Sequence, residues 1–383
     1  MTALAVSPAL VELLHEGDLD PGRPDGRTAG DWNRIVRDAL PHGLGPWLYR
    51  SLERSGALGE LPGDAAERLR GEALGVAARN LMLQAELVTL LRACAERGVA
   101  CVPLRGLALA ERLYGDTAGR PMGDLDLLVR KDELPRVSRI LRDLGFRELT
   151  HRPGFAQAFS YTLVFAKERH GWILVEPHWT IAYPPFTDRL AMEGVWARCL
   201  QRRTVGVESW SLSREDLLLH LCLHLMHPDG TVPLLWFYEV DRLVRREQAD
   251  LDWSRLSSIA GSATVGLLVS QALGRVRELF GTPVPEELLA GFARPPRGVL
   301  QGRLSRLLGE GADLDGREEL AVFLTLGSVR LRLRYVLGLL FPSAHFMMTR
   351  YGLTHPSQLA LAYLRRCCRL VWAGGRGILR LIS

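Results

Sequence analysis

The sequence predicts an α+β protein in which a small sheet lies between two helical regions. Residues 1–98 carry apolar side chains at helical spacing almost throughout, and the same spacing returns after about residue 210. Between these regions, short apolar runs of strand type alternate with two amphipathic helices. We therefore divide the chain into an N-terminal helical region (1–98), a core (99–205) and a C-terminal helical region with a basic tail (206–383).

The core is expected to begin with two strand–helix pairs and to end with a hairpin. Apolar runs bounded by glycine or charged residues predict the strands, and a period of about 3.6 residues predicts the helices. The charged sequence KERHG between the last two strands suits an antiparallel turn. In chain order, we expect strand 99–106, helix 107–115, strand 123–130, helix 131–146, and strands 158–166 and 172–181.

The flanking regions carry further helix signals. WNRIVRDALPHGLGPWLYRSL and NLMLQAELVTLLRACAERG are amphipathic, and the second helix is expected to end at Gly98. Ser213, with Asp216 three residues later, predicts a cap that opens the helix REDLLLHLCLHLMH. Later helices are expected at LLWFYEVDRLVRR, at SATVGLLVSQALGRVRELF, around 317–341 and at 356–372.

The composition is that of an ordinary globular protein, with 383 residues of which 47% are hydrophobic and 24% charged. No run approaches the roughly 18 apolar residues that span a bilayer, and the N-terminus lacks the basic start of a signal peptide. The six cysteines are scattered, which argues against a zinc knuckle or a disulfide framework. We expect a cytoplasmic protein without a transmembrane segment.

The segment 120–131, RPMGDLDLLVRK, places two aspartates two positions apart on an otherwise apolar strand. Successive strand side chains point to opposite faces, so Asp124 and Asp126 share one face while Leu125 and Leu127 share the other. Two carboxylates this close repel each other unless a cation or a proton lies between them. The pattern therefore indicates a chemically active face.

The order of these elements, with a third carboxylate on the last strand, resembles the DNA polymerase beta superfamily of nucleotidyltransferases. The closer resemblance is to a bacterial nucleotidyltransferase family with the pattern KG-x-A-L, Y, R, D-I-D-L-L-V, G and D/E-x-H-W. The matching segments here are RGLAL (105–109), Tyr114, Arg120, DLDLLV (124–129), Gly145 and EPHW (176–179). With LHLCLHLMH, LLWFYEVDRL and LFPSAHFMMTRYG, the resemblance covers most of the chain.

This resemblance implies a small nucleotidyltransferase-type mixed sheet flanked by helical regions. It also implies an enzyme that uses Mg²⁺ or Mn²⁺ to transfer a nucleoside monophosphate from ATP, or another nucleoside triphosphate, with release of pyrophosphate. Two such ions can stabilise both the attacking and the leaving oxygen of an in-line displacement. The residues that would bind metal and carry catalysis are Asp124, Asp126 and Glu176, and Glu176 would also help to deprotonate the acceptor hydroxyl.

The phosphate-binding residues that the resemblance implies are Arg105, Gly106 and Arg120. Glycine lets a nucleotide approach the backbone at the start of a helix, and the guanidinium fork matches phosphate oxygens. One departure concerns this loop, because the wider superfamily usually has Gly-Ser where this chain has Arg105-Gly106-Leu107.

Replacing Asp126 by Asn is expected to remove activity and, by relieving repulsion, to raise the melting temperature without metal.

Histidines offer an alternative metal site that we weigh against a structural role. His220, His224 and His227 recur at helical spacing, but no acidic ligand or HExxH pattern accompanies them. Packing or hydrogen bonding at a domain interface is the favoured interpretation. His178 lies two residues beyond Glu176, on the same strand face, so it could contact the acceptor or a carboxylate.

Two other classes of function compete with the transferase. A catalytically degenerate module of the same fold could bind RNA or a partner protein, and the missing Gly-Ser loop favours it. A glycosyltransferase could also use a DxD motif, but it would need a longer nucleotide-sugar domain in place of the helical residues 1–98. The three carboxylates favour the transferase.

The acceptor is left open as a small molecule, a protein side chain or an RNA end. The chain contains no acidic residue after Glu319, whereas nine arginines follow it. A basic segment of this kind attracts an anionic partner, such as RNA or anionic lipid. Ordinary packing against the helical region is the favoured alternative for this tail.

Overall fold

The computed structural model describes residues 6–16, 27–149, 154–227, 232–292, 317–353 and 355–382. Over these ranges the chain is mainly helical, with one five-stranded sheet and one two-stranded hairpin. The predicted α+β class is confirmed.

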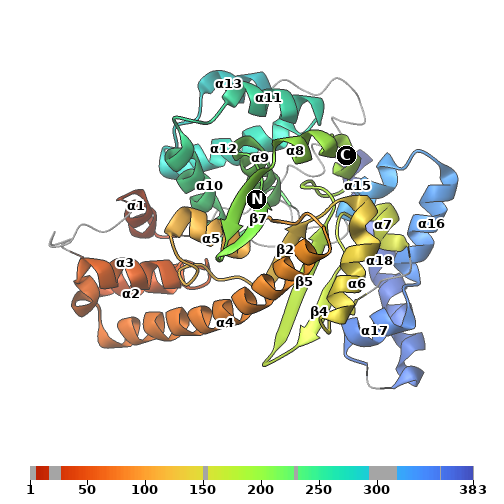
Figure 1. Cartoon of the computed structure of the whole chain (residues 1–383), viewed down its shortest axis with the longest axis horizontal. Helices are drawn as coiled ribbons and strands as arrows, with labels where there is room; N and C mark the ends of the chain where they lie inside the picture. Colours follow the sequence, from red (N-terminus) through yellow and green to blue (C-terminus); the bar gives the residue numbers. More distant parts are fainter. Residues whose placement is uncertain are drawn as a thin grey trace.

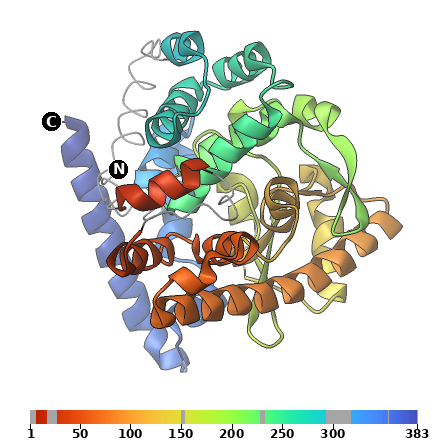
Figure 2. The ribbon, with the colours of Figure 1, turned by 90° about the vertical axis from the view of Figure 1, so that its left-hand side faces the viewer.

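The N-terminal region is helical wherever it is described, as predicted. Its elements are α1 Pro8–Glu16, α2 Ala29–Ala39, α3 Gly45–Ser55, the short 3-10 helix η1 Ala57–Glu60, and α4 Gly63–Glu96. Thr28 and Asp31 cap α2 through reciprocal hydrogen bonds. Figures 1 and 2 show α4, 34 residues long, running beneath α2 and α3 and on toward the sheet.

Helix α4 is the one helix in the described ranges whose length and composition would suffice to cross a membrane. Its residues Leu83, Leu87 and Leu90 are nevertheless buried in the hydrophobic core that includes helix α6 (Leu134–Asp143). A core helix of a soluble protein can be long and apolar enough to meet the same criteria of length and composition. This helix therefore gives only weak support for a membrane span.

The core sheet is mixed, as the family resemblance implied. Its strands lie in the order β1-β2-β5-β4-β3, and β2 and β5 are parallel while the other neighbours are antiparallel. Helices α5 (Gly106–Tyr114) and α6 follow β1 and β2, as predicted. The strands are β1 Val102–Pro103, β2 Asp124–Leu128, β3 Arg147–Glu148, β4 Phe165–Glu168 and β5 Trp172–His178.

The strand predicted over 158–166 is wrong in its first half. Residues Phe155–Phe159 form helix α7, and β4 starts only at Phe165. Phe155 and Phe159 both pack on Tyr335 of α16 (Val329–Leu340), with ring centroids 5.9 and 5.1 Å away. Because residues four apart share one side of a helix, this distant partner favours helix over strand. The predicted β4–β5 hairpin itself is confirmed.

A second hairpin, β6 Leu200–Thr204 with β7 Val207–Ser211, lies outside the predictions. Its turn consists of Val205 and Gly206, with φ values of 45° and 80°. Two positive φ values suit a tight hairpin turn, but Asn-Gly or Asp-Gly is the usual sequence there, so the local signal is weak. The N–H of Trp210 donates to the Cys101 carbonyl, 3.1 Å away, and attaches the hairpin beside β1.

The C-terminal region is helical after β7, as predicted, and Ser213 caps α9 by accepting from the Asp216 N–H. Figure 1 shows α9 to α13 along one side of the molecule and α15 to α18 at one end, near α6 and α7. The elements are α8 Met192–Arg198, α9 Arg214–Leu225, α10 Leu234–Glu247, α11 Trp253–Ser262, α12 Gly266–Phe280, α13 Glu286–Phe292, α15 Arg317–Thr325, α16, α17 Ala344–Tyr351, η4 Pro356–Gln358 and α18 Leu359–Ile382.

Two hydrophobic cores position the sheet. The larger core joins the N-terminal helices to α9, α10 and α12, through residues such as Trp32, Leu218 and Tyr238. The smaller core lies between the sheet, α4 and α6, and it contains Leu125 and Leu127. One face of β2 is therefore buried against helices, and the carboxylates lie on the opposite face, as the alternation predicted.

Candidate active site

Strands β2 and β5 bring two of the predicted carboxylates side by side. The strands pair in parallel register, with Asp126 opposite Glu176 and Leu128 opposite His178. Paired residues on neighbouring strands point to the same face, so Glu176 lies on the aspartate face and away from the apolar core. Asp124 lies two residues before Asp126 on that face. The register therefore brings Asp126 and Glu176 together, with Asp124 on the same face, and the metal-binding and catalytic roles of the three carboxylates stay a prediction.

His178 joins Asp126 and Glu176 in a tight group. Its Nε2 atom lies 3.0 Å from Asp126 Oδ1 and 3.8 Å from Glu176 Oε2. One potential ligand atom from each of the three residues lies within 4.8 Å of the other two. Asp124 stands outside this group but interacts electrostatically with Asp126. The group is a candidate metal site, and His178 extends the set predicted from sequence.

The three carboxyl groups differ in how readily they hold a proton. Burial would raise the pKa of Asp126, but Arg105 and the hydrogen bond with His178 outweigh burial and hold that pKa well below its usual range. Burial, and next the charge of Asp126, raise the pKa of Asp124 and bring the pKa of Glu176 to about 7. Carboxylates that share one site are expected to separate in this way.

Arg105 supplies the positive charge beside Asp126. Its guanidinium lies 2.5 Å from Asp126 Oδ2 and also contacts Nε2 of His224. Gly106, the next residue, starts α5 with φ of 53°, a backbone conformation that favours glycine. A Cβ there would lie 3.9 Å from the Asp124 carbonyl, so conformation rather than crowding selects glycine. Phosphate binding by Arg105 and Gly106 stays a prediction.

Arg120, the third residue predicted to bind phosphate, already has a partner within the protein, and phosphate binding by it stays a prediction. Its guanidinium binds both carboxylate oxygens of Glu239 on α10, at 2.5 and 3.2 Å, and the two side chains are only 5% and 2% exposed. Burial would lower the pKa of Arg120, but the charge of Glu239 and the hydrogen bond with it outweigh burial and raise that pKa, and Asp124 is close enough to add to the increase. The Arg120–Glu239 ion pair therefore joins the core to α10 in this conformation. Contact between Arg120 and a phosphate would require this buried pair to separate.

The histidines of α9 are packed and hydrogen-bonded, which supports the structural interpretation that we favoured. His220 Nδ1 lies 3.0 Å from the Ile181 carbonyl, and His224 stacks on Trp236 with ring centroids 3.9 Å apart. Burial, and next the charge of Arg105, lower the pKa of His220 to about 3 and that of His224 well below its usual value. Their contact with the Arg105 region was not apparent from sequence, because more than one hundred residues separate them.

The basic tail is packed at several of its arginines. Arg332 Nε donates to the Leu326 carbonyl at 3.0 Å, and Arg366 Nε donates to the Leu339 carbonyl at 2.6 Å. Arg366 is 7% exposed. These contacts support ordinary packing for this part of the tail. The side chains of Arg350, Arg376 and Arg380 lie outside the described residues.

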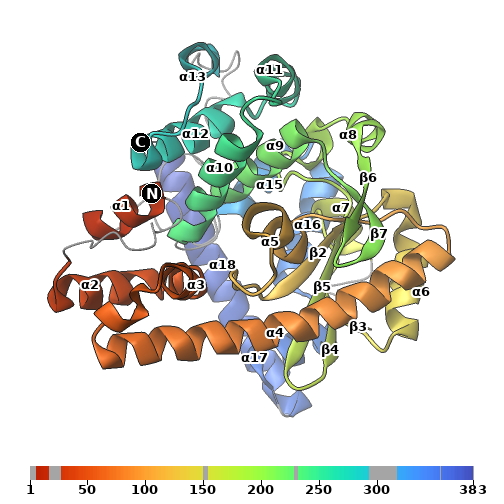
Figure 3. The same ribbon diagram turned by 60° about the vertical axis from the view of Figure 1, so that its left-hand side comes forward.

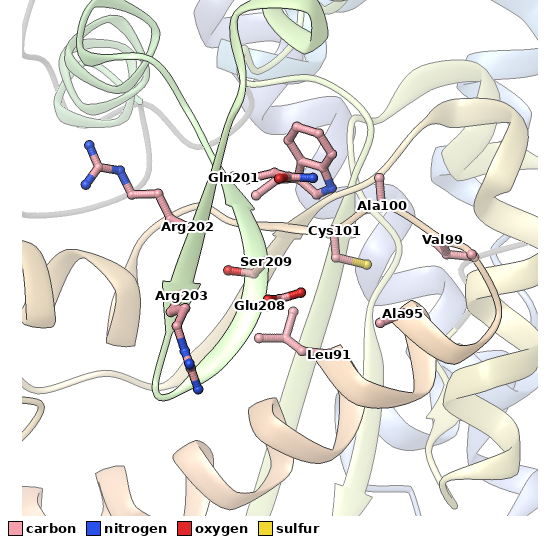
Figure 4. Close-up of a pocket in the computed structure, with 12 residues that line it drawn as sticks. Leu91, Ala95, Val99, Ala100, Cys101, Gln201, Arg202, Arg203, Glu208 and Ser209 are labelled. Atoms are coloured by element: carbon pink, nitrogen blue, oxygen red, sulfur yellow. The ribbon is translucent and has the colours of Figure 1, made fainter.

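A cavity of about 520 Å³ lies apart from the carboxylates, between the end of α4 and the β6–β7 hairpin. Figure 4 shows Leu91 on α4, Cys101 on the segment that follows α4, and Ser209 on the hairpin. Arg202, also on the hairpin, points away from Cys101 in this view. None of the predicted site residues lines the cavity.

A comparison with protein-family models agrees with the resemblance. A family model described as "Uncharacterised nucleotidyltransferase" matches residues 28–281. No curated protein matches the chain. Among solved structures, a solution structure of the antibiotic-resistance factor ANT(2'')-Ia matches with 15% identity and a TM-score of 0.33, covering 52% of this chain and 96% of that one. Because the family model spans well over half of the chain, the protein belongs to this nucleotidyltransferase family.

Proposed function

We propose that the protein transfers a nucleoside monophosphate, AMP from ATP, to an acceptor hydroxyl and releases pyrophosphate. The observation that carries this proposal is the parallel register that puts Glu176 directly beside Asp126, with Asp124 on the same face. Family membership supports nucleotidyl transfer in general. The nucleotide, the metal and the acceptor are parts of the proposal.

The donor atoms fit a divalent cation. Asp126 and Glu176 offer hard oxygen ligands of the kind that Mg²⁺ prefers, while the imidazole of His178 also suits Mn²⁺. Burial and the charge of Asp126 raise the pKa values of Asp124 and Glu176, which supports a further cation at this site. When bound, such an ion would neutralise the triphosphate and stabilise charge on the leaving pyrophosphate.

The chain's own residues can hold and move the proton. We propose that the Glu176 carboxylate accepts the proton of the acceptor hydroxyl, because Glu176 lies on the same face as Asp126 and a bound cation would keep it ionised near neutral pH. The acceptor oxygen then bonds to the α-phosphorus, and the bond from that phosphorus to the oxygen bridging to the β-phosphate breaks. Arg105 would exchange its contact with Asp126 for a phosphate oxygen of the nucleotide.

The Arg105–Asp126 contact also favours a second candidate function. If this ion pair is permanent, Asp126 is unavailable to a metal, and the fold would serve as a non-catalytic module that binds RNA or a protein partner. The transferase requires the pair to open when metal and nucleotide bind. The two functions therefore differ in whether Asp126 is needed for covalent transfer.

A labelling experiment tests the proposal. The protein is incubated with each α-labelled nucleoside triphosphate, Mg²⁺ or Mn²⁺ and a cell extract, and labelled products are separated by size and charge. We expect label transfer with ATP, and the size of the labelled product will identify a small molecule, a protein or an RNA. Failure of every triphosphate to label any species beyond the level of Asp126→Asn would contradict the transferase.

A further inference from the structure

A second cavity, of about 200 Å³, lies where α5 ends, between α3 and α10. Figure 3 shows α5 in the middle of the molecule, with α10 on one side and α3 on another. Four arginines line this cavity, two from α3 and two from α10, together with the last residue of α5 and a carboxylate two residues beyond it. We call it the arginine pocket, and its defining residues are Arg50, Arg54, Tyr114, Asp116, Arg242 and Arg246.

Positive charge in the arginine pocket is only partly neutralised. Among the described residues that line it, Asp116 is the one carboxylate. Asp116 pairs with Arg50 at 3.1 Å and also accepts from the N–H groups of Ala118 and Gly119. Arg242 and Arg246 form no ion pair with any carboxylate in the described ranges. Two other arginines around α10, Arg245 and Arg214, do pair with carboxylates.

The neighbouring arginines outside the pocket have the carboxylate partners that Arg242 and Arg246 lack. Arg245 binds Asp241, and Arg214 binds Glu247 at 2.7 Å. The carboxylates of α10 are therefore occupied by partners outside the pocket. The carbonyl end of α5 offers only about half a negative charge, which is too little to offset the charges of Arg242 and Arg246. Like charges held together in this way favour an anion between them.

Tyr114, which lines the arginine pocket, carries a buried hydroxyl that interacts electrostatically with Arg242. The Tyr114 hydroxyl is buried and has no hydrogen-bond partner among the described residues. Burial, followed by the charge of Glu239, raises the pKa of Tyr114 well above its usual value, so the hydroxyl keeps its proton. An unpaired buried donor is unusual and marks a position where a further acceptor would be stabilised.

We propose that the arginine pocket binds the phosphate group of a small anion, such as inorganic phosphate, pyrophosphate or a phosphorylated metabolite. Guanidinium forks donate paired hydrogen bonds that match phosphate oxygens. The volume admits one or two phosphoryl groups, and it is below the roughly 300–1,000 Å³ of pockets that enclose larger ligands. The site needs no metal and shares none of its defining residues with the carboxylate site.

The pocket is connected to the carboxylate site through the segment that precedes β2. Asn80 of α4 donates to the carbonyls of Thr117 and Arg120, at 2.6 and 2.8 Å, and so holds this segment in place. Arg120 is bound to Glu239, and Asp124 starts the strand four residues later. An anion that tightens the arginine pocket would therefore also order the backbone that leads to Asp124.

Calorimetric titration of the full chain with inorganic phosphate and with pyrophosphate, both in EDTA, tests the proposal without the metal-dependent site. The test variant is Arg242→Gln/Arg246→Gln. The matched control is Arg92→Gln/Arg139→Gln, which removes two exposed arginines outside the pocket. Thermal melting establishes that each variant is folded. We expect saturable binding of the anion by the wild type and by the control. In the test variant, the affinity should fall about tenfold or more for each pocket arginine removed.

Each outcome bears on the assignment. No saturable binding of either anion by the wild type, or equal losses in the test and control variants, would overturn the site. Tighter binding of glycerol 3-phosphate than of phosphate would identify a phosphorylated metabolite as the ligand source. Binding of a short RNA but of neither small anion would overturn the small-anion class. Because catalysis is not measured, a negative result leaves the proposed transferase unaffected, and an inactive Asp126→Asn variant leaves the arginine pocket unaffected.

Discussion

Helix α5 starts beside a cluster of carboxylates and ends beside a cluster of arginines, and the two clusters are neutralised in different ways. At its start, the Asp126 side chain is 5% exposed and has two internal partners, Arg105 and His178. At its end, Arg242 and Arg246 have no carboxylate partner in the described ranges and remain at least partly exposed. The helix dipole favours this arrangement, since its N-terminus attracts negative charge and its C-terminus positive charge.

The difference shows how burial decides what a charged cluster requires. A deeply buried charge must be paired within the protein, because removing it from water costs several kcal/mol. A partly exposed charge is stabilised by water until a ligand replaces that water. We therefore expect substitutions in the carboxylate site to have larger effects than substitutions in the arginine pocket.

The largest effect is expected on catalysis. Asp126→Asn should lower label transfer about 1,000-fold or more, because a bound metal stabilises transition-state charge by several kcal/mol and each 1.36 kcal/mol is tenfold in rate. The control is Arg139→Gln, an exposed change away from both sites. Near-normal transfer by the Asn variant would show that Asp126 binds no essential metal.

Breaking the Arg120–Glu239 ion pair, which lies between the two clusters, should give the next largest effect, a loss of stability. Arg120→Met leaves Glu239 buried without its partner, and we expect the free energy of unfolding to fall by about 3–5 kcal/mol. Urea unfolding followed by circular dichroism measures this change. The double variant Arg120→Met/Glu239→Met should recover much of the loss, and a double variant as unstable as the single one would show that packing rather than unpaired charge is responsible.

The aspartates of β2 should respond in opposite directions when no metal is present. Asp126→Asn deprives Arg105 of its charge partner, so we expect a loss of about 3 kcal/mol, which reverses the stabilisation anticipated from sequence. Asp124→Asn should instead raise the melting temperature slightly, because burial and the charge of Asp126 disfavour a charge at that position. Melting curves in EDTA compare the two variants, and a shift in the same direction for both would contradict this assignment of charges.

The smallest effect is expected in the arginine pocket. Arg242→Gln/Arg246→Gln should raise the stability of the ligand-free protein by about 0.5 kcal/mol, since surface electrostatic interactions are generally worth less than 1 kcal/mol. The increase should shrink as salt screens the repulsion. Melting temperatures at low and high salt measure it, and a destabilised variant at low salt would mean that these arginines stabilise the fold rather than repel each other.

Local sequence patterns were sufficient for much of the fold around the site. The alternation of Asp124 and Asp126 with two leucines identified both the strand and its functional face, because strand side chains alternate with a period of two. Ser213 marked the start of α9 through a hydrogen bond to a residue only three positions away. Helix α7 was missed because the helical choice there depends on Tyr335 in a distant helix.

The sequence by itself determined which residue types lie on each strand face, where several of the helices lie, and which family the motifs resemble. Only the tertiary structure decided that Glu176 lies beside Asp126, that Arg105 neutralises Asp126, and that Arg120 pairs with Glu239. It also decided that arginines of α3 and α10 meet at the end of α5. The physical reason is range: periodicity and capping involve neighbours within four residues, whereas these pairings join segments that the folded cores alone bring together.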